Sequence, residues 1–139
     1  MTASDVKERL QAYRRACKDC RKLSRKIRDK RESMLQPRAV KADALPGGQG
    51  NTLEAAIEKI DTMERHLHDA ESARKKALSD VRALIALAQD PDGRYILTLR
   101  YVDGVSFDDI PTQMYMSPAT MWRRYNRAID QIARKNDSE

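Results

Sequence analysis

Two clusters of helix-breaking residues limit what this 139-residue chain can fold into. The first cluster lies between residues 36 and 51 and prevents one continuous helix there; it consists of Pro37, Pro46, Gly47, Gly48 and Gly50. The second is Asp90-Pro91-Asp92-Gly93, a sequence typical of turns. On both sides of the breaks, apolar residues recur at helical spacing. The sequence therefore predicts an all-α fold with two long helices and a smaller C-terminal module.

The two long helices are expected to pack on each other. The first is predicted from an N-cap at Ser4 to about Leu35, with apolar residues spaced by four and three: Val6, Leu10, Tyr13, Cys17 and Cys20. The second runs from a cap at Asn51 or Thr52 to about Gln89, with this apolar stripe: Leu53, Ile57, Ile60, Leu67, Leu78, Val81 and Ile85. One loop, about residues 36–51, joins them, so we expect a long antiparallel, coiled-coil-like helical hairpin over residues 1–89. Its apolar seam also permits a homo-oligomer.

Residues 94–135 show three short helical patterns, followed by a tail at 136–139. The first pattern ends at Asp103-Gly104, and Ser106 is suited to cap the second. Pro111 predicts that the second helix begins late, because proline inside a helix removes a hydrogen bond and clashes with the preceding turn. Ser117 and Pro118 are typical of the cap and first residue of a helix. This order of elements predicts a small helix-turn-helix module.

The last helix has one apolar face and one polar face. Its apolar face holds Met121, Tyr125, Ala128, Ile129 and Ile132, and Arg123, Asn126 and Arg127 fall roughly opposite. Arginine can bind guanine with two hydrogen bonds, asparagine can bind adenine, and the start of a helix attracts phosphate. The candidate DNA-binding residues are therefore Ser117, Ala119, Thr120, Trp122, Arg123, Arg124, Asn126 and Arg127. A solvated arginine face, and packing of Trp122 on a neighbouring helix, stay open as alternatives.

Most of the positive charge lies at the other end of the chain. The net charge is +6; residues 1–35 hold 12 Lys and Arg against 5 Asp and Glu, whereas residues 94–139 hold 7 against 6. The basic N-terminal helix either contacts DNA phosphates or forms the exterior of a charged hairpin. In the second case its partners would be acidic residues of the second long helix, namely Glu58, Glu64 and Glu71.

Catalytic and metal-binding patterns are weak. The glycine-rich segment at residues 46–50 lacks the lysine and the preceding strand of a phosphate-binding loop. Cys17 and Cys20 would approach His66 and His68 in a hairpin, but histidines two positions apart on a helix point to different sides. We therefore expect a non-enzyme with no catalytic, cofactor-binding or metal-binding residues. A polar N-terminus and no long apolar run predict a cytoplasmic protein without membrane contact.

The C-terminal residues resemble region 4 of the sigma-70 family. The segment ILTLRYVDGVS, residues 96–106, resembles the first half of that region. Ser117-Pro118-Ala119-Thr120-Met121, followed by Arg127-Ala128, resembles its recognition helix. The family usually has alanine at the position of Pro111 and glycine at that of Tyr115. A tyrosine held there at positive φ would be strained.

Nearly the whole chain is similar to small phage and prophage proteins grouped with the ArpU/RinA-type late-gene transcription regulators. Their shared features are a helical hairpin, a Pro-Gly-Gly-x-Gly loop, here residues 46–50, and a region-4-like end. This resemblance implies sequence-specific binding of double-stranded promoter DNA in the cytoplasm of a bacterial host cell, with contact to RNA polymerase. Two alternatives stay open: the DNA-recognition (small) subunit of a phage packaging terminase, and an interaction module that binds polymerase without binding DNA.

Overall fold

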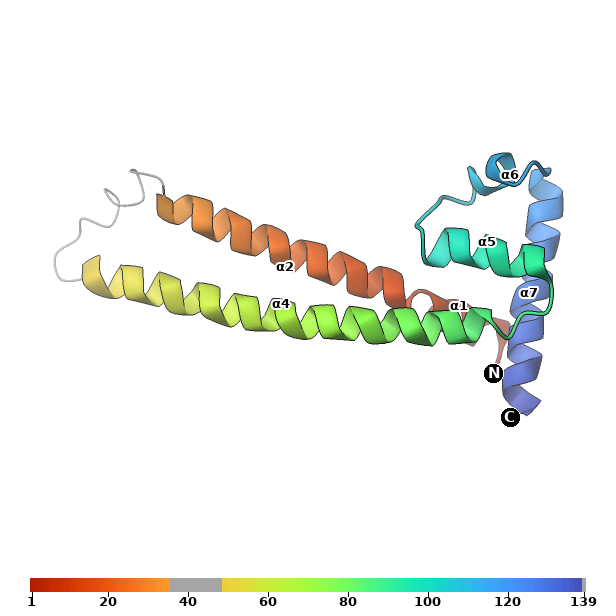
Figure 1. Ribbon diagram of the computed structural model, residues 1–139, viewed down its shortest axis with the longest axis horizontal. Coiled ribbons are helices and arrows are strands. Elements are labelled where there is room, and N and C mark those ends of the chain that lie inside the picture. Colours follow the sequence, from red (N-terminus) through yellow and green to blue (C-terminus); the bar gives the residue numbers. More distant parts are fainter. Residues whose placement is uncertain (36–48, 139) are drawn as a thin grey trace. The chain divides into compact units, whose positions relative to one another are not determined.

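The computed structural model describes residues 1–35 and 49–138, and every regular element in these ranges is a helix. In order they are α1 (Ala3–Leu10), α2 (Ala12–Leu35), α4 (Gln49–Ile85), α5 (Pro91–Tyr101), α6 (Ile110–Gln113) and α7 (Pro118–Ser138) (Figure 1). The predicted all-α fold is confirmed. None of the helices in the described ranges is long and apolar enough to cross a membrane. Contacts divide the chain into two compact units, Cys17–Ala73 and a second made of Met1–Ala16 with Arg74–Glu139.

The unit Cys17–Ala73 contains the middle part of the antiparallel hairpin that the sequence predicts over residues 1–89. Within it, α2 and α4 lie side by side and run in opposite directions (Figure 1). Cys20, Ile27 and Ile60 are buried between them, and Arg31 of α2 forms an ion pair with Glu64 of α4. The predicted apolar stripe of α4 is only partly covered, because two of its side chains remain about half exposed: Leu53 and Ile57.

The long helices begin at residues other than those predicted. Thr2, not Ser4, caps α1, because the Asp5 N–H donates to Thr2 Oγ1 at 3.2 Å and the Thr2 N–H donates to the Asp5 carboxylate at 3.0 Å. Gln11 separates α1 from α2, so the predicted single helix is two helices. Helix α4 begins at Gln49, before the predicted cap at Asn51 or Thr52. Most of the predicted loop, residues 36–48, lies outside the described residues.

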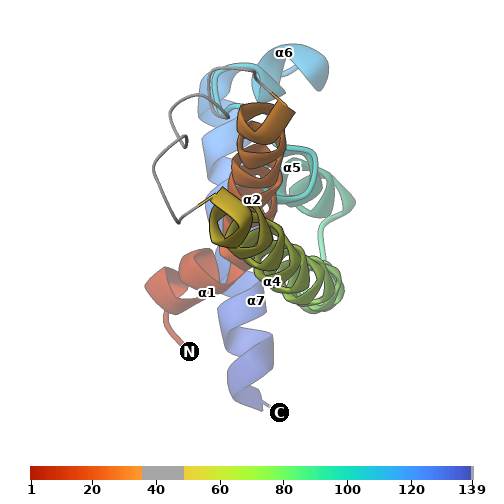
Figure 2. The same cartoon turned by 90° about the vertical axis from the view of Figure 1, so that its left-hand side faces the viewer.

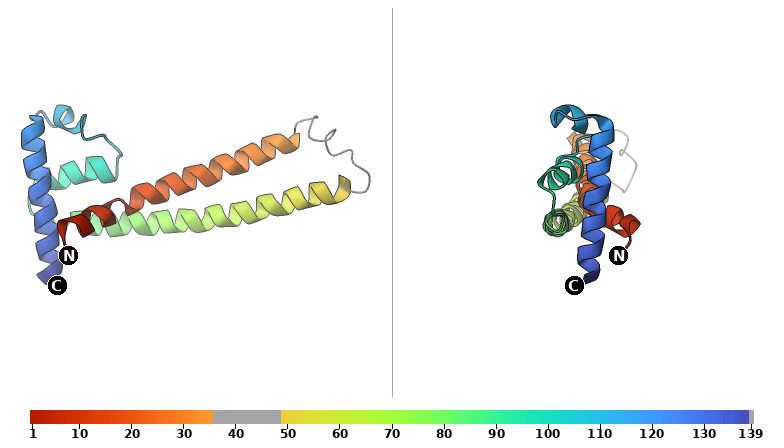
Figure 3. Two further views of the ribbon diagram at one scale, coloured as in Figure 1. Left: turned by 180° about the vertical axis from the view of Figure 1, so that it is seen from behind. Right: turned by 90° about the vertical axis from the view of Figure 1, so that its right-hand side faces the viewer.

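The other unit combines both ends of the chain. Helix α7 lies between α5 and α1 (Figure 3), and these helices share one apolar core with the end of α4. The largest fully buried side chains of this core are Leu10, Ile96, Leu97, Ile110, Met121, Ile129 and Ile132. Burying one leucine, isoleucine or methionine side chain completely stabilises the fold by about 1.5–3 kcal/mol. The division of the chain into residues 1–89 and 94–135 is inferred from turn signals and stays a prediction. The contacts in the structure place α1 in the same unit as the C-terminal helices.

The second predicted break is the start of a helix. Asp90 caps α5 by accepting a hydrogen bond from the Asp92 N–H at 3.2 Å, and Pro91 is the first helical residue. The C-terminal module therefore begins three residues before the predicted position, Arg94. At the other end, α7 continues through residues 136–138, which the sequence pattern assigned to a tail.

Candidate functional site

A short turn joins α6 to α7 and sets the start of the polar helix. Helix α6 is one turn long, and Pro111 is its buried second residue, so the late start predicted from this proline is confirmed to within one residue. Ser106 accepts a hydrogen bond from the Asp109 N–H at 3.3 Å in the turn before α6. The Met116 N–H donates to the Pro111 carbonyl at 3.0 Å, which holds the connection to α7. Figure 2 shows α6 beside the start of α7 and α1 further along it.

Tyr115 occupies a strained position in this turn. Its φ is +54°, in the left-handed region, and its side chain is 98% exposed. A non-glycine residue in this region costs about 1–2 kcal/mol. The strain expected from the sequence is therefore present, and burial of the ring does not offset it. Strained residues that persist without packing are candidates for a binding role.

We expect Tyr115→Gly to raise the free energy of unfolding by about 0.5–1 kcal/mol. The relief of strain exceeds the extra freedom that glycine gives the unfolded chain. Urea unfolding followed by the fluorescence of Trp122, the only tryptophan, measures the change. Tyr115→Ala is the matched control, since it removes the ring but keeps the β-carbon. Equal stabilisation by alanine and glycine would show that backbone strain is not the cause.

The start of α7 is fixed by a side-chain cap. The Thr120 N–H donates to Ser117 Oγ at 3.2 Å, and the Ser117 hydroxyl donates to Thr120 Oγ1 at 2.9 Å. Pro118 is the first helical residue, as predicted. Ser117 and Thr120, two candidate DNA-binding residues, therefore have a structural role at the cap. Ala119 lies exposed between them.

The apolar face of α7 is buried as predicted, and it includes a buried pair of tyrosines. The Tyr125 and Tyr101 hydroxyls are 2.7 Å apart, and burial, followed by this hydrogen bond, raises the pKa of Tyr125 well above its usual value. Trp122 packs on Phe107 and Tyr125, with ring centroids 4.7 and 5.5 Å away. Trp122 is nevertheless 42% exposed, and it lies three positions after Ala119 and four before Asn126, so it neighbours both on the surface of α7.

Two polar contacts attach α7 to the start of α5 and the turn before it. Arg124 forms an ion pair with Asp92 in the first turn of α5. Gln131 Oε1 accepts a hydrogen bond from the Gln89 N–H at 2.8 Å. Arg124 was a candidate DNA-binding residue, but in this structure its guanidinium holds two helices together. The ion pair uses Nη1 of Arg124, and the side chain is about one-third exposed.

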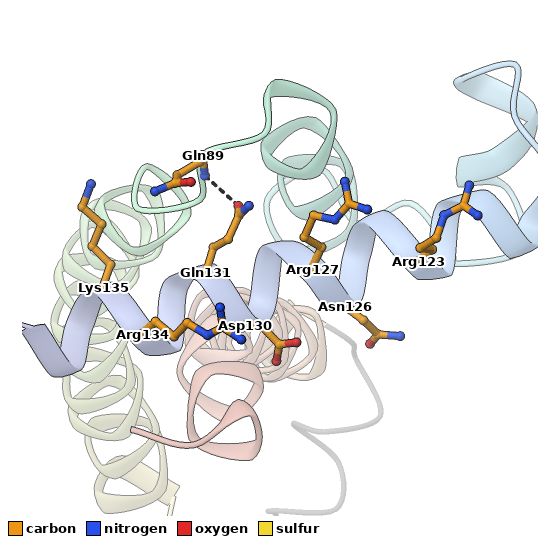
Figure 4. A pocket seen from close by; sticks show the side chains of 8 residues that line it. All are labelled: Gln89, Arg123, Asn126, Arg127, Asp130, Gln131, Arg134 and Lys135. Atoms are coloured by element: carbon orange, nitrogen blue, oxygen red, sulfur yellow. Dashed lines mark hydrogen bonds between the residues drawn. The ribbon is translucent and has the colours of Figure 1, made fainter.

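The remaining candidates lie together on one exposed side of α7, which we call the polar face: Ala119, Arg123, Asn126 and Arg127. An open groove of about 830 Å³ runs along this side and is lined by Gln89, Arg123, Asn126, Arg127, Asp130, Gln131, Arg134 and Lys135. In Figure 4, Arg123 and Arg127 extend to one side of the helix axis and Asn126 and Asp130 to the other. Four cations line the groove with one carboxylate, so it is suited to an anionic ligand that also offers hydrogen-bonding groups.

The groove extends beyond the residues predicted from the sequence. Asp130 and Arg134 lie seven positions after Arg123 and Arg127, so helical periodicity alone would have placed them on the same side. Gln89 has no such signal, because it reaches the groove from another part of the chain. Elsewhere, Cys20 is buried and His66 and His68 are exposed. No group of three or more potential metal ligands occurs in residues 1–35 or 49–138.

The comparisons with known proteins give a family. No curated protein and no solved structure matches the chain significantly. A family model described as a protein of unknown function, DUF1492, matches residues 37–133. The match includes α5, α6 and the part of α7 that carries the polar face. The chain therefore belongs to the DUF1492 family.

Proposed function

We propose that this protein is a sequence-specific DNA-binding regulator of transcription that inserts α7 into the major groove of a promoter. The observation that carries the proposal is the pairing of two faces on one helix. The face opposite the polar face is buried, with Met121, Ala128 and Ile132 fully inaccessible. Since α7 is anchored along one side, its other side is left to bind a partner, as in a recognition helix.

The chemistry of the polar face supports DNA over other anions. Arg123 and Arg127 can each donate two hydrogen bonds to guanine, and Asn126 can pair with adenine. Asp130, which lines the groove beside the polar face, can accept from the amino group of cytosine, a contact that a simple phosphate-binding site would not need. This mixture of donors and one acceptor is typical of base readout, whereas phosphate binding alone would favour cations. We therefore propose a binding role and not a catalytic one; the resemblance to phage and prophage proteins is the basis for placing it in the bacterial cytoplasm.

The contacts that hold α7 in place also support its role as a DNA-recognition helix. The cap at Ser117, the ion pair of Arg124 with Asp92 and the hydrogen bond of Gln131 all hold α7 in one position. A helix held in this way loses little conformational freedom on binding, so more of the contact energy becomes affinity. The resemblance to the sigma-70 and ArpU/RinA-type proteins is the basis for placing the target at a promoter.

The proposal is tested by selecting duplexes from a random-sequence library with the intact protein. We expect a recurring sequence, and about 10³-fold or tighter binding of it than of a scrambled duplex at physiological salt. Fluorescence anisotropy gives both affinities, and Trp122 emission should change on binding because the ring lies beside the polar face. Retention of all duplexes with equal affinity, or of none, would contradict sequence-specific binding.

The two alternative functions predict different outcomes in the same preparation. A packaging subunit should form ring-like oligomers, which mass photometry would detect. An interaction module should copurify with RNA polymerase and show no salt-dependent DNA binding. The exposed, strained Tyr115 favours some contact with a protein, because tyrosine is enriched in protein interfaces.

A further inference from the structure

The hairpin unit carries a second cationic surface, separate in sequence from α7. Lys18, Arg21, Lys22 and Arg25 follow one another on α2 at spacings of three, one and three, which places them on one side of the helix. All four side chains are exposed. The opposite side of α2 is the one that packs on α4, through Cys20 and Ile27. We call these four residues the basic face.

Acidic side chains of the hairpin do not neutralise the basic face. Within residues 1–35 and 49–138, the ion pair that joins α2 to α4 is Arg31–Glu64, and no residue of the basic face takes part in one. Two acidic residues of α2 lie next to the basic face, Asp19 three positions before Lys22 and Asp29 four positions after Arg25, and neither forms an ion pair with it. One alternative from the sequence is that ion pairs between the two long helices neutralise the basic N-terminal helix. The four residues of the basic face form no such ion pairs in the part of the chain that the structure describes.

This concentration of charge disfavours the helix that bears it. Lys18 and Lys22 are like charges at i,i+4, and so are Arg21 and Arg25; such pairs destabilise a helix. An extended polyanion would remove that repulsion by placing negative charge along the whole face. The basic face is thus better explained by a bound partner than by the stability of the hairpin.

We infer that the basic face binds the phosphate backbone of double-stranded DNA without reading its sequence. This inference rests on the proposed function, to which it adds a second contact that supplies affinity. From Lys18 to Arg25 the helix rises about 10 Å, a length along which a duplex presents about six phosphate charges. An anionic membrane is disfavoured, because a membrane-surface helix must insert an apolar face and that of α2 is covered by α4.

The test replaces the basic face by glutamine, a good helix former, in Lys18→Gln/Arg21→Gln/Lys22→Gln/Arg25→Gln of the full chain. Binding to the selected and the scrambled duplex is measured by anisotropy between 50 and 200 mM salt. Four lost phosphate contacts should make the slope of log affinity against log salt shallower by about 3.6. Over this range the wild-type protein should lose about 150-fold more affinity than the variant. The ratio of the affinities for the selected and the scrambled duplex should not change.

The matched control removes four charges from exposed positions of α4, in Lys59→Gln/Arg65→Gln/Lys75→Gln/Arg82→Gln. Its slope should stay close to that of the wild-type protein. Circular dichroism checks that the helices persist. If the four-residue variant unfolds, the two half-variants, Lys18→Gln/Arg21→Gln and Lys22→Gln/Arg25→Gln, should each reduce the slope by about 1.8.

The possible results separate the two proposals. An unchanged slope in a variant that still binds the selected duplex overturns the basic-face inference and leaves the proposed function standing. A reduced slope in a protein that shows no preference for any duplex supports the basic face and contradicts sequence-specific reading by α7. Absence of DNA binding by the wild-type protein overturns both. Binding to phosphatidylserine vesicles that depends on the four residues, with no effect on DNA, also overturns the inference.

Discussion

Replacing Arg123 and Arg127 together by alanine should lower the affinity for the selected duplex by about 30-fold to about 10⁴-fold. Each arginine that pairs with a base contributes about 1–3 kcal/mol of discrimination, and the two effects should add roughly. Affinity for a scrambled duplex should fall much less, so the ratio between the duplexes collapses. Both side chains are exposed on the polar face, and the free energy of unfolding should therefore change by less than about 0.5 kcal/mol.

Arg124→Ala is the closest control, because it removes the same charge from the same helix. Arg124 is paired with Asp92, so its loss should reduce stability slightly, by less than about 1 kcal/mol, and leave the ratio between duplexes nearly unchanged. Lys59→Ala/Lys75→Ala removes two exposed charges from α4 and controls for the change in net charge. Equal losses in all three variants would mean that α7 contributes only general electrostatic attraction.

The parts of this site that could be predicted are those encoded within a few residues. Ser117 and Pro118 predict where α7 begins, and the spacing of Met121, Tyr125, Ile129 and Ile132 predicts which side is buried. Both features depend on neighbours along one helix, and both are found in the structure. The polar face follows directly, since it is the side left over.

In the turn before α7, the sequence predicts the backbone conformation at two residues, Pro111 and Tyr115. Pro111 fixes where α6 begins, because proline fits only the first turn of a helix, and the positive φ of Tyr115 follows the end of α6 after a single turn. Tyr115 keeps the positive φ that the resemblance to region 4 implied, although the residue that favours it is absent. The local path of the chain therefore persists at an energetic cost.

Contacts between distant segments could not be predicted. Thr2 and Asp5 have capping-box spacing, but nothing in the first ten residues indicates that Val6 and Leu10 join the core around α7. The ion pair of Arg124 with Asp92 likewise joins residues that lie far apart in the sequence, and no local pattern indicates it. Periodicity shows that a side chain is buried, not which helix covers it. For this reason the sequence places Arg124 among the candidate DNA-binding residues, although in the structure it forms an ion pair with Asp92 of α5.

Helices α5 and α7 are also in contact at Gly93, and Gly93→Ala is expected to weaken that contact. A β-carbon at Gly93 would lie 2.9 Å from the β-carbon of Ala128, much closer than two carbons pack. Neither atom can rotate away, since each is attached directly to a helical backbone, so α5 and α7 must separate. We expect the free energy of unfolding to fall by about 1–3 kcal/mol, as for other overpacked cores. The sign is diagnostic, because alanine normally stabilises a helix relative to glycine by about 0.5–1 kcal/mol.

A swap of the two residues tests whether that single contact is responsible. In Gly93→Ala/Ala128→Gly the extra β-carbon fills the space that the other leaves, so the double variant should be more stable than the sum of the single effects predicts, by about 1 kcal/mol or more. Urea unfolding of the four proteins in this cycle measures the coupling. Because the shift in Gly93→Ala moves α7 itself, the same substitution should also lower affinity for the selected duplex, and the swap should restore it. Strict additivity of the two substitutions would refute the close approach of α5 to α7.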